Sequence, residues 1–208
     1  MSKEKSAAEL LKEKLFMQKK HAGLLMTEQQ IAECDDFCES YKDFLDSSKT
    51  EREAVRTAIT LAKEEGFREY TPGEALKAGD KIYWVNRGKA IILAVIGKDS
   101  VENGVRLAAA HIDSPRIDLK QNPLYEDNEV ALFKTHYYGG IKKYQWTALP
   151  LALHGVVMLK GGERKEICVG EEDGDPIFYI TDILPHLGAD QSAKTLGKAI
   201  DGESLNAV

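Results

Sequence analysis

The run VRLAAAHIDSP, residues 105–115, decides how the rest of the chain is interpreted. Its small and aliphatic residues, from Val105 to Ala110, show no clean polar alternation, which is typical of a strand buried on both faces. The predicted strand ends at His111, and Pro115 then turns the chain away from the sheet. Residues 90–96, AIILAVI, form a second run of the same kind. Buried strands next to helical segments predict a layered α/β domain, with helices packed on a sheet.

The helical segments come first in the chain. Apolar residues recur at helical spacing over residues 7–15 and again over 27–45. A third helix is expected to begin after Thr50, because Glu53 three residues later completes a capping box. Its apolar positions continue to Gly66, which is a plausible stop.

From about Tyr125 the sequence changes to short β-type runs separated by glycine turns. Gly161-Gly162 between two such runs predicts a β-hairpin. Residues 188–208 are weakly patterned and end without a predicted closing strand, so the sheet of the first part looks unfinished and the chain reads as cut short. The other strands expected in this part cover residues 130–133, 151–159, 166–169 and 177–180.

Composition narrows the class of protein. Of the 208 residues, 43% are hydrophobic and 30% are charged, which excludes a disordered or collagen-like chain. The net charge of −6 argues against nucleic acid or an anionic membrane as the main partner. No run approaches the ~18 apolar residues of a membrane span. The first twenty residues are charged throughout and contain no apolar core of signal-peptide length. The odd number of cysteines, three, fits reduced thiols in a reducing compartment. We therefore expect a cytoplasmic protein.

His111 and Asp113 are the densest candidates for chemistry. Side chains two residues apart in a strand lie on one side of it, and both residues would stand at its C-terminal end. Open α/β sheets bind ligands at that edge. A neutral imidazole there is a natural zinc ligand, and the carboxylate could fix its tautomer. The residues alone leave a second interpretation open, in which His111 is a hydrogen-bonded histidine of the core.

Four segments together resemble the aspartyl aminopeptidases, a family of two-zinc exopeptidases. Ala110-His111-Ile112-Asp113-Ser114-Pro115 resembles the first metal motif of that family. The other three follow in the family's order: Thr135-His136-Tyr137-Tyr138-Gly139-Gly140 with Trp146 beyond it, Leu153-His154-Gly155-Val156-Val157, and Asp182-Ile183-Leu184-Pro185-His186-Leu187.

The resemblance implies roles for three residues. His111 matches the first zinc ligand, and Asp113 matches the acid that orients this histidine. His186 matches the histidine that reaches from the interface domain into a neighbouring subunit's site and contacts the reacting peptide. From the residues alone, His186 could equally be an interface or core histidine without chemistry, and His136 and His154 are expected to be structural.

The resemblance also implies a domain organisation and an activity. Residues 1–124 would be the N-terminal part of the zinc aminopeptidase catalytic domain, and residues 125–208 part of an inserted β-rich oligomerisation domain. The enzyme would hydrolyse N-terminal residues, acidic ones in many relatives, from peptides. Two zinc ions per complete site, with manganese or cobalt as alternatives, would activate a shared water. The expected assembly is a homo-oligomer, a dodecamer in relatives.

The chain departs from the family pattern in one respect. The family completes its site with a bridging Asp, a Glu-Glu pair that includes the general base, a further Asp and a final His, and none of these is matched. Glu64-Glu65 and Glu171-Glu172 are interpreted as solvated surface. One histidine cannot make a catalytic zinc site, so we expect this chain alone to be inactive. The alternative is a truncated, non-catalytic chain that serves only as a binding or oligomerisation module.

Overall fold

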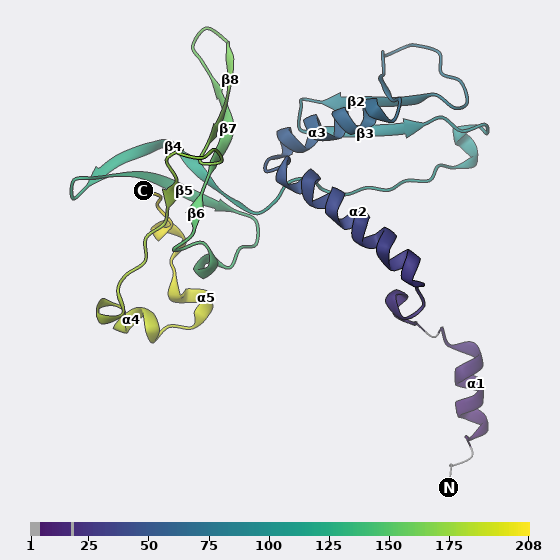
Figure 1. The fold of residues 1–208 in the computed structure, drawn as a ribbon, viewed down its shortest axis with the longest axis horizontal. Helices are drawn as coiled ribbons and strands as arrows, with labels where there is room; N and C mark the ends of the chain where they lie inside the picture. The colour runs from purple at the N-terminus through teal and green to yellow at the C-terminus, as the bar shows by residue number, and fades with distance from the viewer. Residues whose placement is uncertain (1–4, 18) are drawn as a thin grey trace. The chain divides into compact units, whose positions relative to one another are not determined.

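The computed structural model describes residues 5–17 and 19–208, and it divides into two compact units, residues 1–46 and 47–208 (Figure 1). The first predicted domain includes residues 1–4 and 18, which lie outside the described residues. Its predicted boundary after Leu124 falls within a strand of the second unit and stays a prediction. No helix among the described residues is long and apolar enough to cross a membrane.

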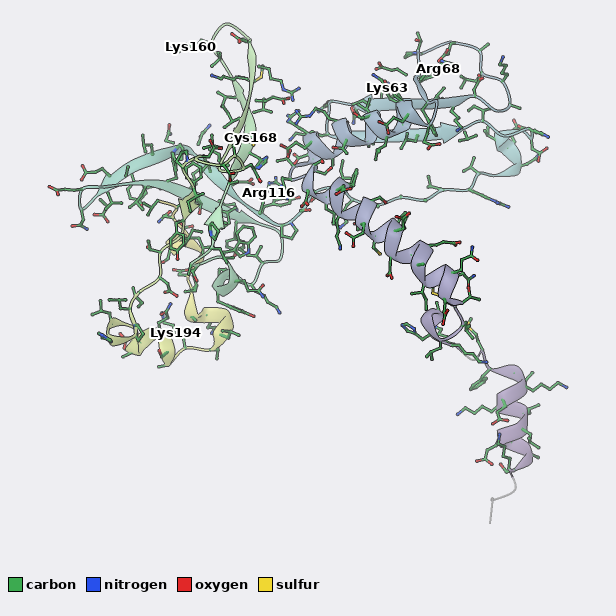
Figure 2. All side chains as sticks on the ribbon, in the orientation of Figure 1. Lys63, Arg68, Arg116, Lys160, Cys168 and Lys194 are labelled. Atoms are coloured by element: carbon green, nitrogen blue, oxygen red, sulfur yellow. The ribbon has the colours of Figure 1, made fainter. Side chains whose placement is uncertain are left out.

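The first unit is helical, as its apolar spacing predicted. The helix α1 (Ala7–Leu15) begins at a Ser6 capping box, and α2 (Glu28–Asp46) follows a short 3-10 turn at Ala22–Leu24. Neither helix buries a residue, and Figure 2 shows side chains projecting from both.

The second unit opens with α3 and a small sheet. The helix α3 (Glu51–Glu64) begins at the predicted capping box, because Thr50 Oγ1 accepts from the backbone N–H of Glu53 and the Glu53 carboxylate accepts from that of Thr50. It packs through Ala54, Val55 and Ala62, which are buried, against the strands that follow. These strands are β1 (Arg68–Glu69), β2 (Lys81–Asn86) and β3 (Ala90–Val95), in the order β1-β2-β3.

The predicted strand over residues 105–111 is wrong. Residues 104–115 contain no helix or strand, and the residues Val105 and Leu107 are 72% and 84% exposed. A strand requires a neighbour that accepts and donates its ladder hydrogen bonds. Within the described residues, no strand pairs with this segment. It is an extended loop that leads from β3, through a 3-10 turn at Val101–Asn103, into β4.

The remaining strands form three two-stranded ribbons. The pair β4 (Arg116–Asp127) and β5 (Val130–Tyr138) is antiparallel, and its register shifts between Leu119 and Leu124, around Pro123, which has no N–H for the ladder. The predicted glycine hairpin is confirmed: β7 (Leu153–Met158) pairs with β8 (Arg164–Val169). The third pair is β6 (Pro150–Leu151) with β9 (Phe178–Tyr179).

Residues 188–208 turn out to complete the main core. They form the one-turn helices α4 (Ala189–Ser192) and α5 (Leu196–Ala199) and a 3-10 turn at Gly202–Ser204. Leu205 is fully buried with Ile180, and Ala207 forms a β-bridge with Phe133 of β5. We expected no closing strand here. The bridge is too short to leave a β pattern in the sequence, although its apolar side chains fill the space beside β5 and β9.

Candidate metal centre

His111 lies on the exposed loop that precedes β4, and its side chain is 82% exposed. Its Nδ1 atom is 2.8 Å from the backbone oxygen of Asp113 and 3.3 Å from Oδ1 of the same residue. Both oxygens are acceptors, so Nδ1 carries the proton and donates it. The lone pair of a neutral His111 ring therefore resides on Nε2 and is available to a metal ion.

Asp113 is held from its other side by Tyr138, the last residue of β5. The Tyr138 hydroxyl donates to Asp113 Oδ2 at 2.7 Å. This hydrogen bond is the main reason why the pKa of Asp113 lies below its usual value, and a bond to its own backbone and the nearby His111 act in the same direction. Asp113 thus carries a carboxylate with one oxygen toward Tyr138 and the other toward His111. The predicted pairing of His111 with Asp113 exists in the structure.

The described residues around His111 supply one candidate zinc ligand, which is fewer than a zinc site needs. A catalytic zinc ion takes three protein ligands and a water. Among residues 5–17 and 19–208, no group of three or more His, Cys, Asp or Glu side chains is suitably placed to hold a metal ion. A ligand role for His111 therefore requires further donors besides the groups that surround it in these residues.

His186 lies on the 3-10 turn Pro185–Leu187, in an exposed segment. Its neighbours Leu184 and Leu187 are large apolar residues that are also exposed. In the part of the chain that the structure describes, no hydrogen bond or ion pair joins His186 to His111 or Asp113. The structure therefore brings the first two predicted site residues together and leaves the third apart.

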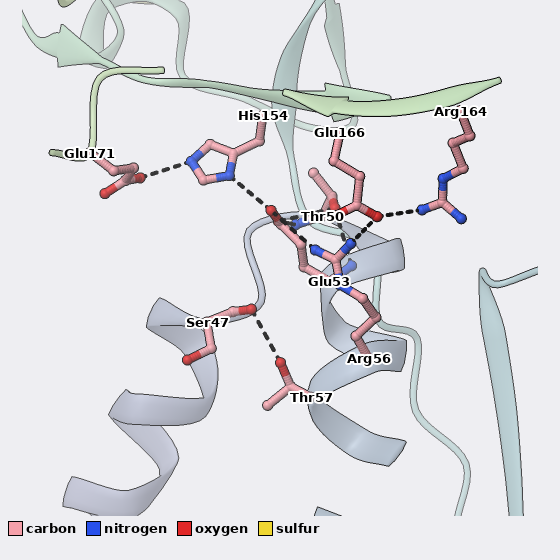
Figure 3. Close-up of polar contacts among 9 residues, drawn as sticks. All are labelled: Ser47, Thr50, Glu53, Arg56, Thr57, His154, Arg164, Glu166 and Glu171. Atoms are coloured by element: carbon pink, nitrogen blue, oxygen red, sulfur yellow. Dashed lines mark hydrogen bonds and ion pairs between the residues drawn. The ribbon is translucent and has the colours of Figure 1, made fainter. Parts of the chain in front are cut away.

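A second polar cluster, absent from the sequence-based prediction, surrounds His154 of β7 (Figure 3). Its Nδ1 atom is 2.9 Å from Glu53 Oε1, at the start of α3, and its Nε2 atom is 2.9 Å from Glu171 Oε1, just after β8. A ring that faces a carboxylate at each nitrogen donates from both, which only the imidazolium can do. Glu171, expected to be plain solvated surface, is therefore one arm of an ionic bridge.

Burial and the neighbouring carboxylates shift the pKa of His154 in opposite directions. The side chain of His154 is only 14% exposed. Burial alone would lower the pKa of His154, but the hydrogen bonds to Glu53 and Glu171 outweigh it and raise this pKa. Burial alone would likewise raise the pKa of Glu53, and the hydrogen bonds from His154 and Thr50 outweigh it and lower that pKa. Both shifts favour the charged pair.

Arginines extend the same cluster. Arg56 of α3 forms a close ion pair with Glu166 of β8, and Arg164 donates to the same carboxylate at 2.8 Å. Together these contacts link α3 to the β7–β8 hairpin beside a cavity of about 760 Å³ that both elements line. His154 and Glu53 are 101 residues apart in the sequence, so their contact could not be predicted from spacing. Only the capping role of Glu53 was visible in the sequence.

Comparison with known proteins identifies the class. The family model described as aminopeptidase I zinc metalloprotease (M18) matches residues 44–208. A probable M18 family aminopeptidase 1 from Clostridium acetobutylicum is 48% identical over 196 residues, which cover 92% of this chain and 42% of that protein. The chain therefore belongs to the M18 family of zinc metallopeptidases, the aminopeptidase family that its four motifs resemble.

Solved structures agree with this assignment. The crystal structure of an M18 aminopeptidase from Thermotoga maritima superposes with a TM-score of 0.81 at 39% identity, over 92% of this chain and 41% of that one. A yeast mApe1, described as a dodecamer, has a TM-score of 0.59 at 20% identity, over 73% of this chain and 36% of that one, and shares the fold. The present chain spans about 42% of the length of its curated Clostridium relative.

Proposed function

We propose that this chain contributes to a cytoplasmic aminopeptidase that removes N-terminal residues from peptides, and that His111 is its first zinc ligand. The observation that supports this best is the geometry of His111, whose Nδ1 is bound to Asp113 while Nε2 is left for a metal ion. The length of the relatives supports the view that the other ligands come from polypeptide outside these residues.

The roles of the residues follow from their contacts. His111 would hold the metal through Nε2, and Asp113 would keep the His111 ring oriented and its proton on Nδ1. When bound, zinc, as two ions per complete site, would polarise the scissile carbonyl and supply an activated water. Acidic N-terminal residues are the proposed preference, and manganese or cobalt are alternative metals.

His186 is proposed to act in an assembled homo-oligomer. Its exposed turn lies among exposed apolar residues, Leu184 and Leu187, which suit a contact between subunits. An imidazole presented across such a contact would donate a hydrogen bond to the peptide bound in the neighbouring site. The dodecameric yeast relative makes an assembly of this kind reasonable.

The zinc content of the full-length aminopeptidase that carries this chain tests the central proposal. His111→Ala should remove about one zinc ion per subunit and abolish peptide hydrolysis, because a structural neighbour cannot replace a lost metal ligand. His136→Ala is the matched control, since His136 lies in β5 and stacks on Tyr137 with ring centroids 5.7 Å apart. Full zinc occupancy in the His111 variant, measured by atomic emission, would return this residue to a structural role.

A further inference from the structure

The hydroxyl of Tyr138 anchors the loop that carries His111. Tyr138 donates to Asp113 Oδ2 at 2.7 Å, and the other carboxylate oxygen lies 3.3 Å from His111 Nδ1. One carboxylate thus faces the phenol on one side and the imidazole on the other. Because the loop over residues 104–115 contains no helix or strand, this bond ties Asp113 to a strand that has a fixed register.

The fold explains why Tyr138 is in this place. Arg116, the first residue of β4, pairs with Tyr138 in the ladder, so the end of β5 lies beside the residues that precede β4. The chain then turns at Gly139, which has φ of 79°, and a side-chain Cβ at this glycine would lie 3.5 Å from Pro115. The turn after Tyr138 therefore passes close to the end of the His111 loop.

The ring of Tyr138 is held as well as its hydroxyl. The Arg116 guanidinium lies over the ring, 4.2 Å from its centroid, and its Nε donates to Asp118 Oδ1 at 2.7 Å. A cation at that position attracts the ring face. Tyr138 is nevertheless 41% exposed, so core packing does not account for a tyrosine here. Its specific contribution is the directed hydroxyl.

We propose that Tyr138 is a positioning residue for the metal ligand: through Asp113 it keeps the His111 proton on Nδ1 and directs Nε2 outward to the metal. This inference rests on the proposed role of His111. A hydroxyl bond to one carboxylate oxygen limits rotation of the carboxylate, and the remaining oxygen then stays within reach of the imidazole. Residues that support a metal ligand in this way typically change metal affinity about 10–100-fold when mutated.

The first test uses the metal-free 208-residue chain and requires no zinc. Nitrogen NMR of ¹⁵N-labelled histidine reports which His111 nitrogen carries the proton. Tyr138→Phe keeps the ring under Arg116 and removes only the hydroxyl, and it should lower the fraction of the Nδ1-protonated tautomer. Tyr137→Phe, the neighbouring tyrosine, is the matched control and should leave this fraction unchanged. An unchanged fraction in a folded Tyr138→Phe protein would overturn the proposal.

A double-mutant cycle tests whether Tyr138 acts through Asp113. Asp113→Ala should shift the His111 tautomer at least as far as Tyr138→Phe does. Adding Tyr138→Phe to the Asp113→Ala background should then change nothing, because the hydroxyl has lost the carboxylate through which it acts. Additive effects of the two substitutions would mean that Tyr138 acts by another route, and the proposal would be wrong.

The second readout is zinc retention by the full-length aminopeptidase during competition with a chelator. Tyr138→Phe should weaken zinc binding by about 10-fold, the lower end of the range for residues that support a metal ligand. The effect is at the lower end because Tyr138 contacts His111 only through Asp113, one hydrogen bond further from the metal. Unaltered zinc affinity would count against the role of Tyr138. A wrong assignment of His111 as a zinc ligand can be told apart from a wrong role for Tyr138. If His111 is not a ligand, the His111→Ala protein keeps its zinc, whatever the tautomer measurement gives.

Discussion

Replacing His154 by glutamine removes the positive charge that joins α3 to the β7–β8 hairpin. Glutamine is of similar size and can still donate to one of the two carboxylates, so the loss is confined to the charge and one hydrogen bond. Glu53, whose side chain is 17% exposed, would lose its nearest charged partner and keep only the longer ion pair with Arg56, at 3.9 Å. His154→Gln should therefore destabilise the second unit without creating a large cavity.

The expected magnitude follows from the two arms of the bridge. A hydrogen bond to a charged partner contributes about 1.5–3 kcal/mol, and the His154–Glu53 bond is well shielded from water. The Glu171 side chain is 43% exposed, so solvent screening reduces its arm to about 0.2–1 kcal/mol. Because glutamine keeps part of one bond, we expect the free energy of unfolding to fall by about 2 kcal/mol at about pH 6.

The effect should depend on pH with a defined sign. The folded-state pKa of His154 is raised above its ordinary 6.5, so the charged bridge stabilises fully below that value and is lost as pH rises through the folded pKa. The pKa of Glu53 is lowered, so its contribution is present above the ordinary 4.5 and is lost as pH falls through the folded value. The stability difference between wild type and variant should therefore be largest at about pH 6 and smaller at about pH 9.

Urea unfolding of both proteins at the two pH values measures this difference. His136→Gln is the control for loss of a histidine ring, because this histidine stacks on Tyr137 rather than bridging two carboxylates. A stability loss in His154→Gln that is equal at both pH values, or larger at the higher one, would contradict the charged bridge. The hydrogen-bond geometry would then have to arise from a neutral ring.

Two further outcomes test the proposed enzyme. In the full-length protein, His186→Ala subunits and His111→Ala subunits are each expected to be inactive. Co-expressed in one oligomer, with mixing shown by tag pull-down, they should regain partial activity. Mixed oligomers without activity would mean that His186 serves only in packing. The purified 208-residue chain should hydrolyse no aspartyl, glutamyl or leucyl chromogenic substrate with zinc, manganese or cobalt, because one ligand cannot complete the site. Metal-dependent turnover that survives repurification would contradict this, and binding to partners without turnover would favour the non-catalytic module.

The elements predicted correctly are those that local chemistry determines. The Thr50–Glu53 capping box marked the start of α3 within one turn, and Gly161-Gly162 marked the β7–β8 hairpin. The strand over residues 105–111 failed because apolar composition indicates burial only where a partner covers it. The strand β4 was missed because Asp118, Lys120 and Pro123 interrupt its apolar pattern.

The candidate site was predicted in part for a similar reason. His111 and Asp113 are two residues apart, so their contact depends on local geometry that a motif can encode. Tyr138 reaches Asp113 through the register of β4 and β5, and His154 meets Glu53 across a separation of 101 residues. Contacts of that range depend on tertiary packing, which spacing along the chain does not specify.

The burial of Leu205 has a consequence for the order in which the molecule forms during synthesis. Leu205 and Ala207 fill the core beside Phe133 of β5, and the backbone of Phe133 exchanges hydrogen bonds with Ala207. The hairpin of β4 and β5 is therefore synthesised before the residues that cover one of its apolar sides. That side stays uncovered until translation has reached Ala207. During that interval the nascent chain exposes apolar surface, and exposed apolar surface makes partly folded chains prone to aggregate.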